Sequence, residues 1–162
     1  METKIRDFIN TDTPDILEIN QESVQMLSPM NEKRFHQLRK LSSLLLVCQT
    51  PHGIGGFLLG FESNTKYDST NYQWFDENEE QFLYIDRVAV SSPYRGQGIG
   101  KQLYDQAVIW ARNKSLISVV AEINIKPRNE ESLCFHKMRR FVEIGRRSPE
   151  SGKIVSLQKL LV

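Results

Sequence analysis

Apolar and polar positions repeat along the chain with two different periods, and these periods predict the secondary structure. Residues 4–9, "KIRDFI", alternate polar and apolar, which is typical of a strand with one buried face. Two apolar runs, 44–50 and 53–62, bracket "PHG", a combination that predicts a β-hairpin. Gly55 and Gly56 within the second run predict a bulge or a close backbone approach. Further strands are expected over 81–90, 116–125, 140–145 and 154–162.

In most of the chain between these strands, apolar residues repeat at the spacing of a helix. Residues 11–27 are expected to form a helix with Thr13 as its cap, Pro14 in its first turn and a buried face of Ile16, Ile19 and Val24. Other helices are expected over 31–43, over 130–138 after a cap at Asn129, and beyond residue 98, where Ile99, Leu103, Ala107 and Trp110 share one face. Residues 63–81 form the longest irregular stretch.

The order of these elements indicates the fold class. Early helices and a hairpin are followed by strand, helix, strand, helix, strand, strand. This order predicts an α/β (α+β) mixed sheet in a three-layer arrangement. A chain of 162 residues is expected to form one domain, 1–162.

Composition and charge narrow the functional classes. Lysine plus arginine and aspartate plus glutamate nearly cancel, leaving a formal charge of +1, which argues against a nucleic-acid partner. No apolar run reaches transmembrane length, and the first residues lack the apolar core of a secretion signal. Cys48 and Cys134 are expected to be buried thiols in a cytoplasmic protein. The scattered histidines and cysteines predict no metal site.

The stretch "SSPYRGQGIGKQLYDQA", residues 91–107, carries the strongest chemical signal. Glycines at a helix N-terminus let backbone N–H groups approach an anion, and Arg95 and Lys101 add positive charge. The turn therefore predicts a phosphate or diphosphate site. Two known motifs do not fit: Gly100-Lys101 is followed by Gln102 instead of the hydroxyl residue of a P-loop, and the glycine spacing is not that of a dinucleotide fingerprint.

The span "RVAVSSPYRGQGIGKQL" resembles the acetyl-coenzyme-A-binding motif of the GNAT acetyltransferase superfamily. A second similar region is "INIKPRNEESLCFHKMRRFVEIG", which departs from the usual pattern in two positions: His136 replaces a tyrosine and Arg140 replaces a glycine. The resemblance covers about residues 82–145. It implies a GNAT-like fold, with a mixed sheet of about seven strands flanked by about four helices.

The resemblance also implies acetyl-CoA as cofactor. Two parallel strands would splay apart, the backbone at Val88 and Val90 would contact the pantetheine arm, and the amides of residues 95–101 would hold the diphosphate. The oxyanion donor would be a backbone N–H near Val88 or Ala89. The implied cofactor-binding residues are Val88, Ala89, Val90, Arg95, Gly96, Gln97, Gly98, Ile99, Gly100, Lys101, Asn129, Ser132 and Phe135.

Acetyl transfer to an amine needs a proton acceptor and benefits from an acid at the departing thiolate. By resemblance His136 lies beside the sulfur and would donate a proton as imidazolium, although a half-exposed packing histidine fits the same position. Asp86 is the expected base, because a carboxylate in an apolar strand is costly unless it is paired; a structural salt bridge is the alternative reading. Glu22, Glu122 and a water chain stay open as alternative bases.

The segment 62–80 combines aromatic side chains with six acidic residues and one lysine, which favours a cation. Tyr72 and Trp74, with Glu22 from the first helix, are the expected acceptor-binding residues, although the aromatics could equally anchor the segment to the core. Five basic residues could either contact the cofactor's 3′-phosphate or form an ordinary solvent-exposed surface: Lys126, Arg128, Lys137, Arg139 and Arg140.

The expected function is an enzyme that moves an acetyl group from acetyl-CoA to a small primary amine or amino acid in a ternary complex. A protein or peptide N-acetyltransferase and a non-catalytic acetyl-CoA sensor are the alternatives. The expected partners are a small-molecule amine or a peptide, with no nucleic acid and no membrane, in a monomer or homodimer.

Overall fold

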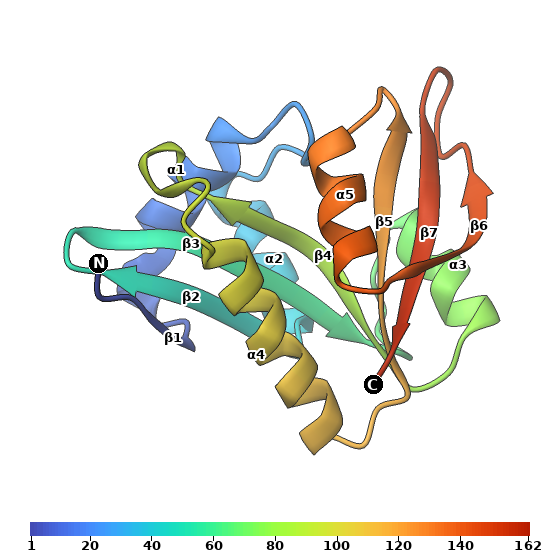
Figure 1. The fold of residues 1–162 in the computed structure, drawn as a ribbon, viewed down its shortest axis with the longest axis horizontal. Coiled ribbons are helices and arrows are strands. Elements are labelled where there is room, and N and C mark those ends of the chain that lie inside the picture. Colours follow the sequence, from blue (N-terminus) through green and yellow to red (C-terminus); the bar gives the residue numbers. More distant parts are fainter. The chain divides into compact units, whose positions relative to one another are not determined.

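Seven strands hydrogen-bond in the order β1-β2-β3-β4-β5-β7-β6 in the computed structural model, which describes residues 1–162 (Figure 1). The strands are β1 Lys4–Asp7, β2 Leu44–Thr50, β3 Gly53–Glu62, β4 Phe82–Val90, β5 Ser118–Lys126, β6 Val142–Arg147 and β7 Ile154–Leu161. The helices are α1 Thr13–Glu22, α2 Glu32–Leu41, α3 Thr70–Asn78, α4 Ile99–Asn113 and α5 Glu130–Met138.

The sheet is mixed, as the sequence predicts. β4 pairs with β5 in parallel, whereas the pairs β1–β2, β2–β3, β5–β7 and β6–β7 are antiparallel. The parallel ladder covers only three residues of each strand, from Phe82 opposite Ser118 to Tyr84 opposite Val120. None of the helices is both long enough and apolar enough to cross a membrane.

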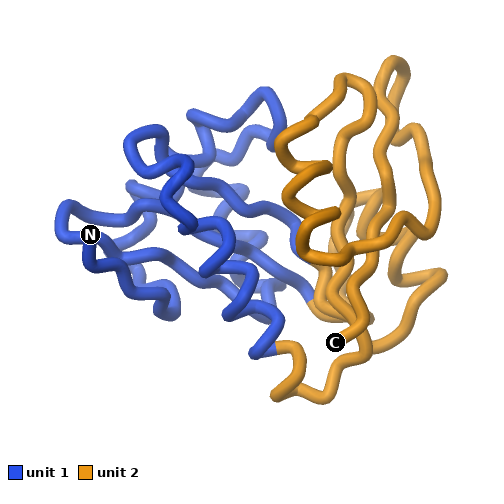
Figure 2. The backbone as a smooth tube through the Cα atoms, viewed as in Figure 1, with its two compact units in different colours: residues 1–61, 85–110 blue, residues 62–84, 111–162 orange.

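The chain divides into two compact units (Figure 2). The first comprises Met1–Phe61 and Ile85–Trp110, and the second comprises Glu62–Tyr84 and Ala111–Val162. Strand β4 contributes to both, because its first three residues belong to the second unit and the remainder to the first.

Close backbone approach in the first unit explains the glycine pair of β3. A Cβ on Gly56 would lie 2.9 Å from the backbone oxygen of Ala89 and 3.0 Å from Ile99 Cγ2. A Cβ on Gly55 would also meet Ile99, at 3.2 Å from its Cδ1. Helix α4 can therefore pack directly on the β3 backbone (Figure 1), which confirms the predicted close approach.

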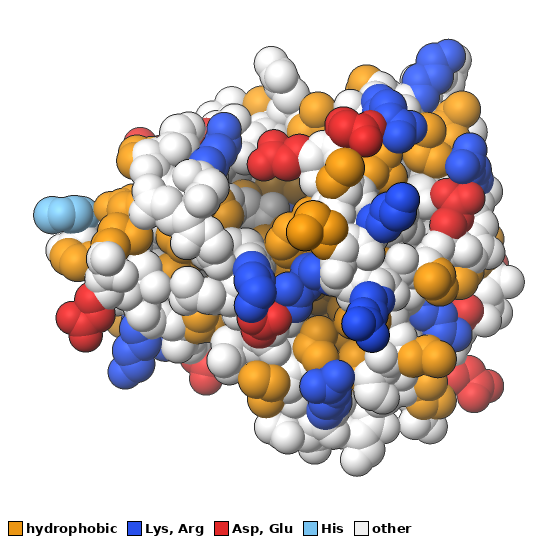
Figure 3. Space-filling view, in the orientation of Figure 1, with side chains coloured by type: hydrophobic (Ala, Val, Ile, Leu, Met, Phe, Trp, Pro, Cys, Tyr) orange, Lys and Arg blue, Asp and Glu red, His pale blue; other side chains and the backbone are white.

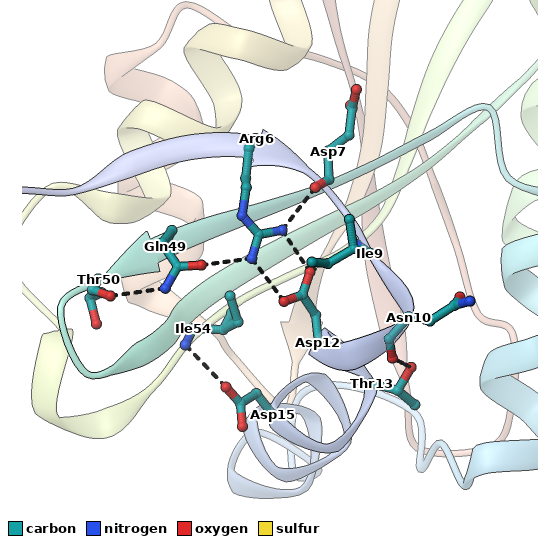
Figure 4. Close-up of polar contacts among 10 residues, drawn as sticks. All are labelled: Arg6, Asp7, Ile9, Asn10, Asp12, Thr13, Asp15, Gln49, Thr50 and Ile54. Atoms are coloured by element: carbon teal, nitrogen blue, oxygen red, sulfur yellow. Dashed lines mark hydrogen bonds and ion pairs between the residues drawn. The ribbon is translucent and has the colours of Figure 1, made fainter.

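The start of α1 differs from the prediction. Thr13 is the first helical residue instead of the cap, and the preceding Asp12 makes no side-chain cap bond. The reason is visible in Figure 4: Arg6 donates to both Asp12 oxygens, at 2.7 and 2.8 Å, and the backbone N–H of Ile9 donates to Oδ2 at 2.9 Å. The helix also ends at Glu22, so Val24 lies beyond it.

The second unit contains a helix that the sequence pattern missed. Residues 63–81, expected to be irregular, include α3, and the Ser69 side chain caps it by accepting from the Tyr72 N–H at 3.3 Å. Tyr72 and Phe75, one turn apart, are both buried. Five helices therefore flank the sheet instead of the expected four.

Candidate functional site

The glycine turn joins β4 to α4. After Val90 the chain makes a short 3₁₀ turn over Ser92–Tyr94, and α4 begins at Ile99. Gly96 and Gly98 have φ of +75° and +82°, a region that favours glycine. No atom lies within 4 Å of a Cβ placed on either residue, so the turn presents bare backbone to open space.

The backbone amides of this turn are unused within the protein. The N–H groups of residues 96–101 donate no hydrogen bond to any group of the chain, and the first helical bond runs from Gln102 N to Gly98 O at 3.0 Å. The 15-residue helix α4 adds the positive end of its dipole at the same place. Six consecutive free donors with this field form an anion cradle.

The charged side chains of the turn are folded back onto it. Arg95 donates from Nε to the Val90 carbonyl at 3.1 Å and from Nη2 to Ser23 Oγ at 3.4 Å. Lys101 pairs with Asp105 at 2.9 Å. Asp105 therefore offsets the charge of Lys101, whereas Arg95 keeps its charge beside the amides and holds the loop in shape.

Glu22 lies at the entrance of the turn. Its carboxylate accepts from the Ser92 N–H at 2.8 Å and from Ser92 Oγ at 2.6 Å. These hydrogen bonds from Ser92 lower the pKa of Glu22. Glu22 thus ties the end of α1 to the loop, and its expected contact with the acceptor stays a prediction.

Asp86 is paired with Arg87, its neighbour in β4. Arg87 Nε donates to Asp86 Oδ2 at 2.7 Å, and both side chains are almost fully covered. Arg87 Nη1 also donates to Asn20 Oδ1 and to the Ser28 carbonyl, each at 3.0 Å. A buried guanidinium needs a counter-charge, so the salt-bridge reading of Asp86 is the one that the structure supports.

His136 is buried, only 2% exposed, so the alternative of a packing histidine holds for a buried ring and not for a half-exposed one. It packs edge-on against Phe135 and Phe141, with ring centroids 5.3 and 5.0 Å away. Its Nδ1–H donates to the Ser132 carbonyl at 2.7 Å. Burial lowers the pKa of His136 to about 4, so the ring is neutral at pH 7 and the expected imidazolium donor is absent.

Asn129 caps α5 as predicted, because its side chain accepts from the Ser132 N–H at 3.2 Å. Phe135 is partly exposed, and the cofactor contacts expected of these three residues stay predictions. Cys134, expected in the core, is exposed, whereas Cys48 is buried as predicted. Arg140, which replaces the family's glycine, has φ of +68°.

The second unit also contains a tyrosine–glutamate pair that the sequence analysis named only in part. Tyr84 OH donates to Glu122 Oε1 at 2.8 Å. Tyr84 is the last residue of β4 in the parallel ladder, and Glu122 lies two residues beyond its ladder partner Val120 in β5. Glu122 was an alternative base, whereas Tyr84 was not singled out. One sequence signal could have identified Tyr84. It places a hydroxyl group in an otherwise apolar strand, next to the strand that contains Glu122.

The expected acceptor residues of the segment 62–80 serve the core. Tyr72 is 1% exposed, and its OH donates to the Glu62 carbonyl at 2.7 Å. Trp74 is partly exposed and packs edge-on against Phe75, with centroids 5.3 Å apart, and over Gly145. Their contacts therefore support the alternative interpretation, in which these aromatic side chains anchor the segment to the core.

Comparisons with known proteins bear on this site. The profile of the acetyltransferase (GNAT) family matches residues 15–141, which include the whole glycine turn. A comparison with curated proteins gives no match.

Solved structures share the fold at low sequence identity. Ard1 from Thermoplasma volcanium superposes with a TM-score of 0.79 at 19% identity, covering 100% of this chain and 99% of that one. The ribosomal-protein-S18-alanine N-acetyltransferase from Escherichia coli gives 0.74 at 15% identity, covering 99% and 94%. A chain of the NatC complex bound to Gag peptide and CoA gives 0.77 at 17% identity, covering 100% and 99%.

Proposed function

Because this chain belongs to the acetyltransferase (GNAT) family, we propose that it moves an acetyl group from acetyl-CoA to a primary amine by direct attack in a ternary complex. Membership makes it an acetyl-CoA-dependent acyltransferase; the acceptor and the residue roles are the proposed part. The acceptor we favour is a small amine or an amino acid. A peptide is the second candidate, since one protein of the same fold is named as an N-acetyltransferase of a ribosomal protein and another is bound to a peptide and CoA.

The observation that carries the proposal is the set of six free amides at residues 96–101. The residues present fit a diphosphate, because the glycines leave the backbone bare and the amide N–H groups point to no protein acceptor. The backbone of Val88, Ala89 and Val90 would orient the pantetheine arm in the manner of an added strand. When bound, acetyl-CoA supplies an acetyl group activated as a thioester.

For proton transfer we propose Glu122, with Tyr84 as its hydrogen-bonding partner. Asp86 is neutralised by Arg87, and Glu22 is held by Ser92, so neither carboxylate is placed well to accept a proton. Glu122 accepts instead from a neutral phenol at 2.8 Å. Such a partner orients the carboxylate without stabilising its charge as strongly as an arginine does.

The cofactor site is tested by titrating acetyl-CoA calorimetrically into the wild type and into Gly98→Ala. A methyl group at φ +82° strains the turn and reshapes the cradle, so we expect affinity to fall about tenfold or more. Gly152→Ala is the matched control, since Gly152 has φ of +79° and the same open surroundings but lies between β6 and β7. Equal affinities in the two variants, or no wild-type binding at millimolar acetyl-CoA, would refute the site.

The activity is tested by measuring thiol release from acetyl-CoA over a panel of amines, amino acids and short peptides. We expect release with at least one class of primary amine, and the class identifies the acceptor. Retained acetyl-CoA binding with no release for any acceptor would instead indicate a sensor that binds without turnover.

The proton-transfer role is tested with Glu122→Gln and Tyr84→Phe. Loss of the base is expected to lower kcat about a hundredfold in Glu122→Gln, while acetyl-CoA affinity is retained. Tyr84→Phe is expected to give a smaller loss and a shifted pH–rate profile, because only the orientation of the carboxylate is disturbed. Glu131→Gln, on the exposed side of α5, is the control. A full wild-type kcat in Glu122→Gln would contradict the assignment.

A further inference from the structure

The loop that carries the amide cradle is an exposed part of the first unit. Residues 95–98 are exposed, and on this face the first unit shows mostly backbone and uncharged side chains in the space-filling view (Figure 3). Gly96 and Gly98 give this stretch more conformational freedom to lose than other residues would. An exposed cradle of this kind binds an anion tightly only if other parts of the protein hold it in shape beforehand.

Tyr94, the last residue before this stretch, ties the loop to the β2–β3 hairpin. Its OH lies 3.2 Å from Thr50 Oγ1, which also contacts the Gly53 carbonyl at 2.9 Å and the His52 N–H at 3.1 Å. A carbonyl can only accept and an N–H can only donate, so the single Thr50 proton goes to Gly53 and Tyr94 donates to Thr50. The Tyr94 ring also packs on bare backbone, because a Cβ on Gly55 would lie 3.2 Å from its Cδ2.

Thr50, which accepts this hydrogen bond, is itself held in place. It is 3% exposed and ends β2, where the hairpin turns. The return strand of the hairpin is fixed by α1, since the Ile54 N–H donates to Asp15 Oδ2 at 3.1 Å (Figure 4). Asp15 and Glu22 are seven residues apart and so lie on about the same face of α1. Because Glu22 accepts from the Ser92 N–H at 2.8 Å, α1 supports the loop at two points, directly and through the hairpin.

We propose that Tyr94 is a positioning residue for the cofactor, because through Thr50 it holds the amides of residues 96–101 in the arrangement that a diphosphate needs. This role rests on the diphosphate site proposed above, and Tyr94 acts through the loop without contacting the reacting atoms. The hydrogen bond from Gln97 Nε2 to the Pro93 carbonyl, at 3.0 Å, joins two residues of the loop and cannot fix its place on the unit. The hydrogen bond from Tyr94 to Thr50 can do so.

The role is tested by titrating acetyl-CoA calorimetrically into variants that remove one hydroxyl each. Tyr94→Phe and Thr50→Val should each weaken binding about threefold to tenfold, the effect of one lost hydrogen bond. The double variant should bind no more weakly than either single variant, because both remove the same contact. Thr50→Ser keeps the hydroxyl and should bind as the wild type does. Tyr67→Phe, which removes a phenol hydroxyl from a tyrosine buried in the second unit, is the control.

The ligand-free protein gives a second measurement that does not depend on cofactor binding. Backbone ¹⁵N order parameters of residues 96–98 should fall in Tyr94→Phe and in Thr50→Val, while those in the middle of α4 and the urea unfolding midpoint stay close to the wild-type values. In Thr50→Ser they should not change.

The outcomes separate the positioning role from the site on which it rests. A wild type that does not bind acetyl-CoA refutes the diphosphate site itself. In a wild type that binds, unchanged affinity or unchanged order parameters in Tyr94→Phe overturn the role of Tyr94 alone. The same conclusion follows if Thr50→Ser binds as weakly as Thr50→Val, or if Tyr67→Phe weakens binding as much as Tyr94→Phe does.

Discussion

Single residues acquire their chemistry here from burial and from neighbours on other segments. His136 illustrates this most clearly, since its burial between Phe135 and Phe141 lowers its pKa to about 4 and removes it as a charged donor at neutral pH. Asp86 follows the same principle, because Arg87 turns a carboxylate that could have been a base into half of a buried ion pair. Residue type alone specified neither outcome.

The histidine shift predicts a pH-dependent stability. Below pH 6.5 the unfolded chain takes up a proton at His136 that the folded protein does not bind until about pH 4, so the free energy of unfolding falls as the pH is lowered through this window. Between pH 7 and pH 5 this loss amounts to about 2 kcal/mol relative to His136→Leu, which cannot take up the proton. Urea unfolding of both proteins at the two pH values measures it, and parallel pH dependence in the variant would contradict the shift.

At the scale of elements, the glycines of β3 and the N-terminus of α4 depend on one another. The absence of side chains at Gly55 and Gly56 lets α4 approach β3, with Ile99 over the pair. The same helix begins with the six unused amides, so the packing of α4 also positions the cradle. Glu22 secures the loop at the end of β4 through Ser92.

This dependence predicts the cost of one methyl group. In Gly56→Ala the Cβ would lie 2.9 Å from a backbone oxygen that cannot move alone, so the free energy of unfolding should fall by about 2 kcal/mol. Gly145→Ala is a matched strand control, because its Cβ would meet Leu157 and Trp74 at an ordinary 3.5 Å. Its stability should change by less than about 1 kcal/mol. Chemical denaturation compares the two, and equal losses would show that the contact at Gly56 is relieved.

At the scale of the whole molecule, the fold is a mixed seven-stranded sheet of an acetyl-CoA-dependent acyltransferase. β7, the last strand in the sequence, lies between β5 and β6, so β6 becomes the edge strand of the sheet. That residues 1–162 form a single domain stays a prediction. A ligand that binds only the folded state raises the free energy of unfolding of the protein, and this effect can be measured on the whole chain.

Coenzyme A should therefore raise the melting temperature. A ligand at a hundred times its Kd stabilises the folded state by about 2.7 kcal/mol, which corresponds to roughly 5–10 °C in Tm for a protein of this size. At the same concentration a tenfold weaker affinity leaves about 1.4 kcal/mol, so the shift should be about half as large or less for Gly98→Ala and unchanged for Gly152→Ala. Differential scanning calorimetry measures all three, and an equal shift in Gly98→Ala would place the binding outside the turn.

Local patterns in the sequence were sufficient for the features that depend on neighbouring residues. The hairpin around "PHG", the Asn129 cap and the cradle at residues 96–101 follow from turn chemistry, capping and glycine spacing, which act over a few residues. Tertiary structure decided the rest: the position of β7 between β5 and β6, the pairing of Asp86 with Arg87, the neutral state of His136 and the aromatic packing that orders α3. These depend on long-range contacts and on desolvation, because the energy of a buried group is set by whichever segments surround it.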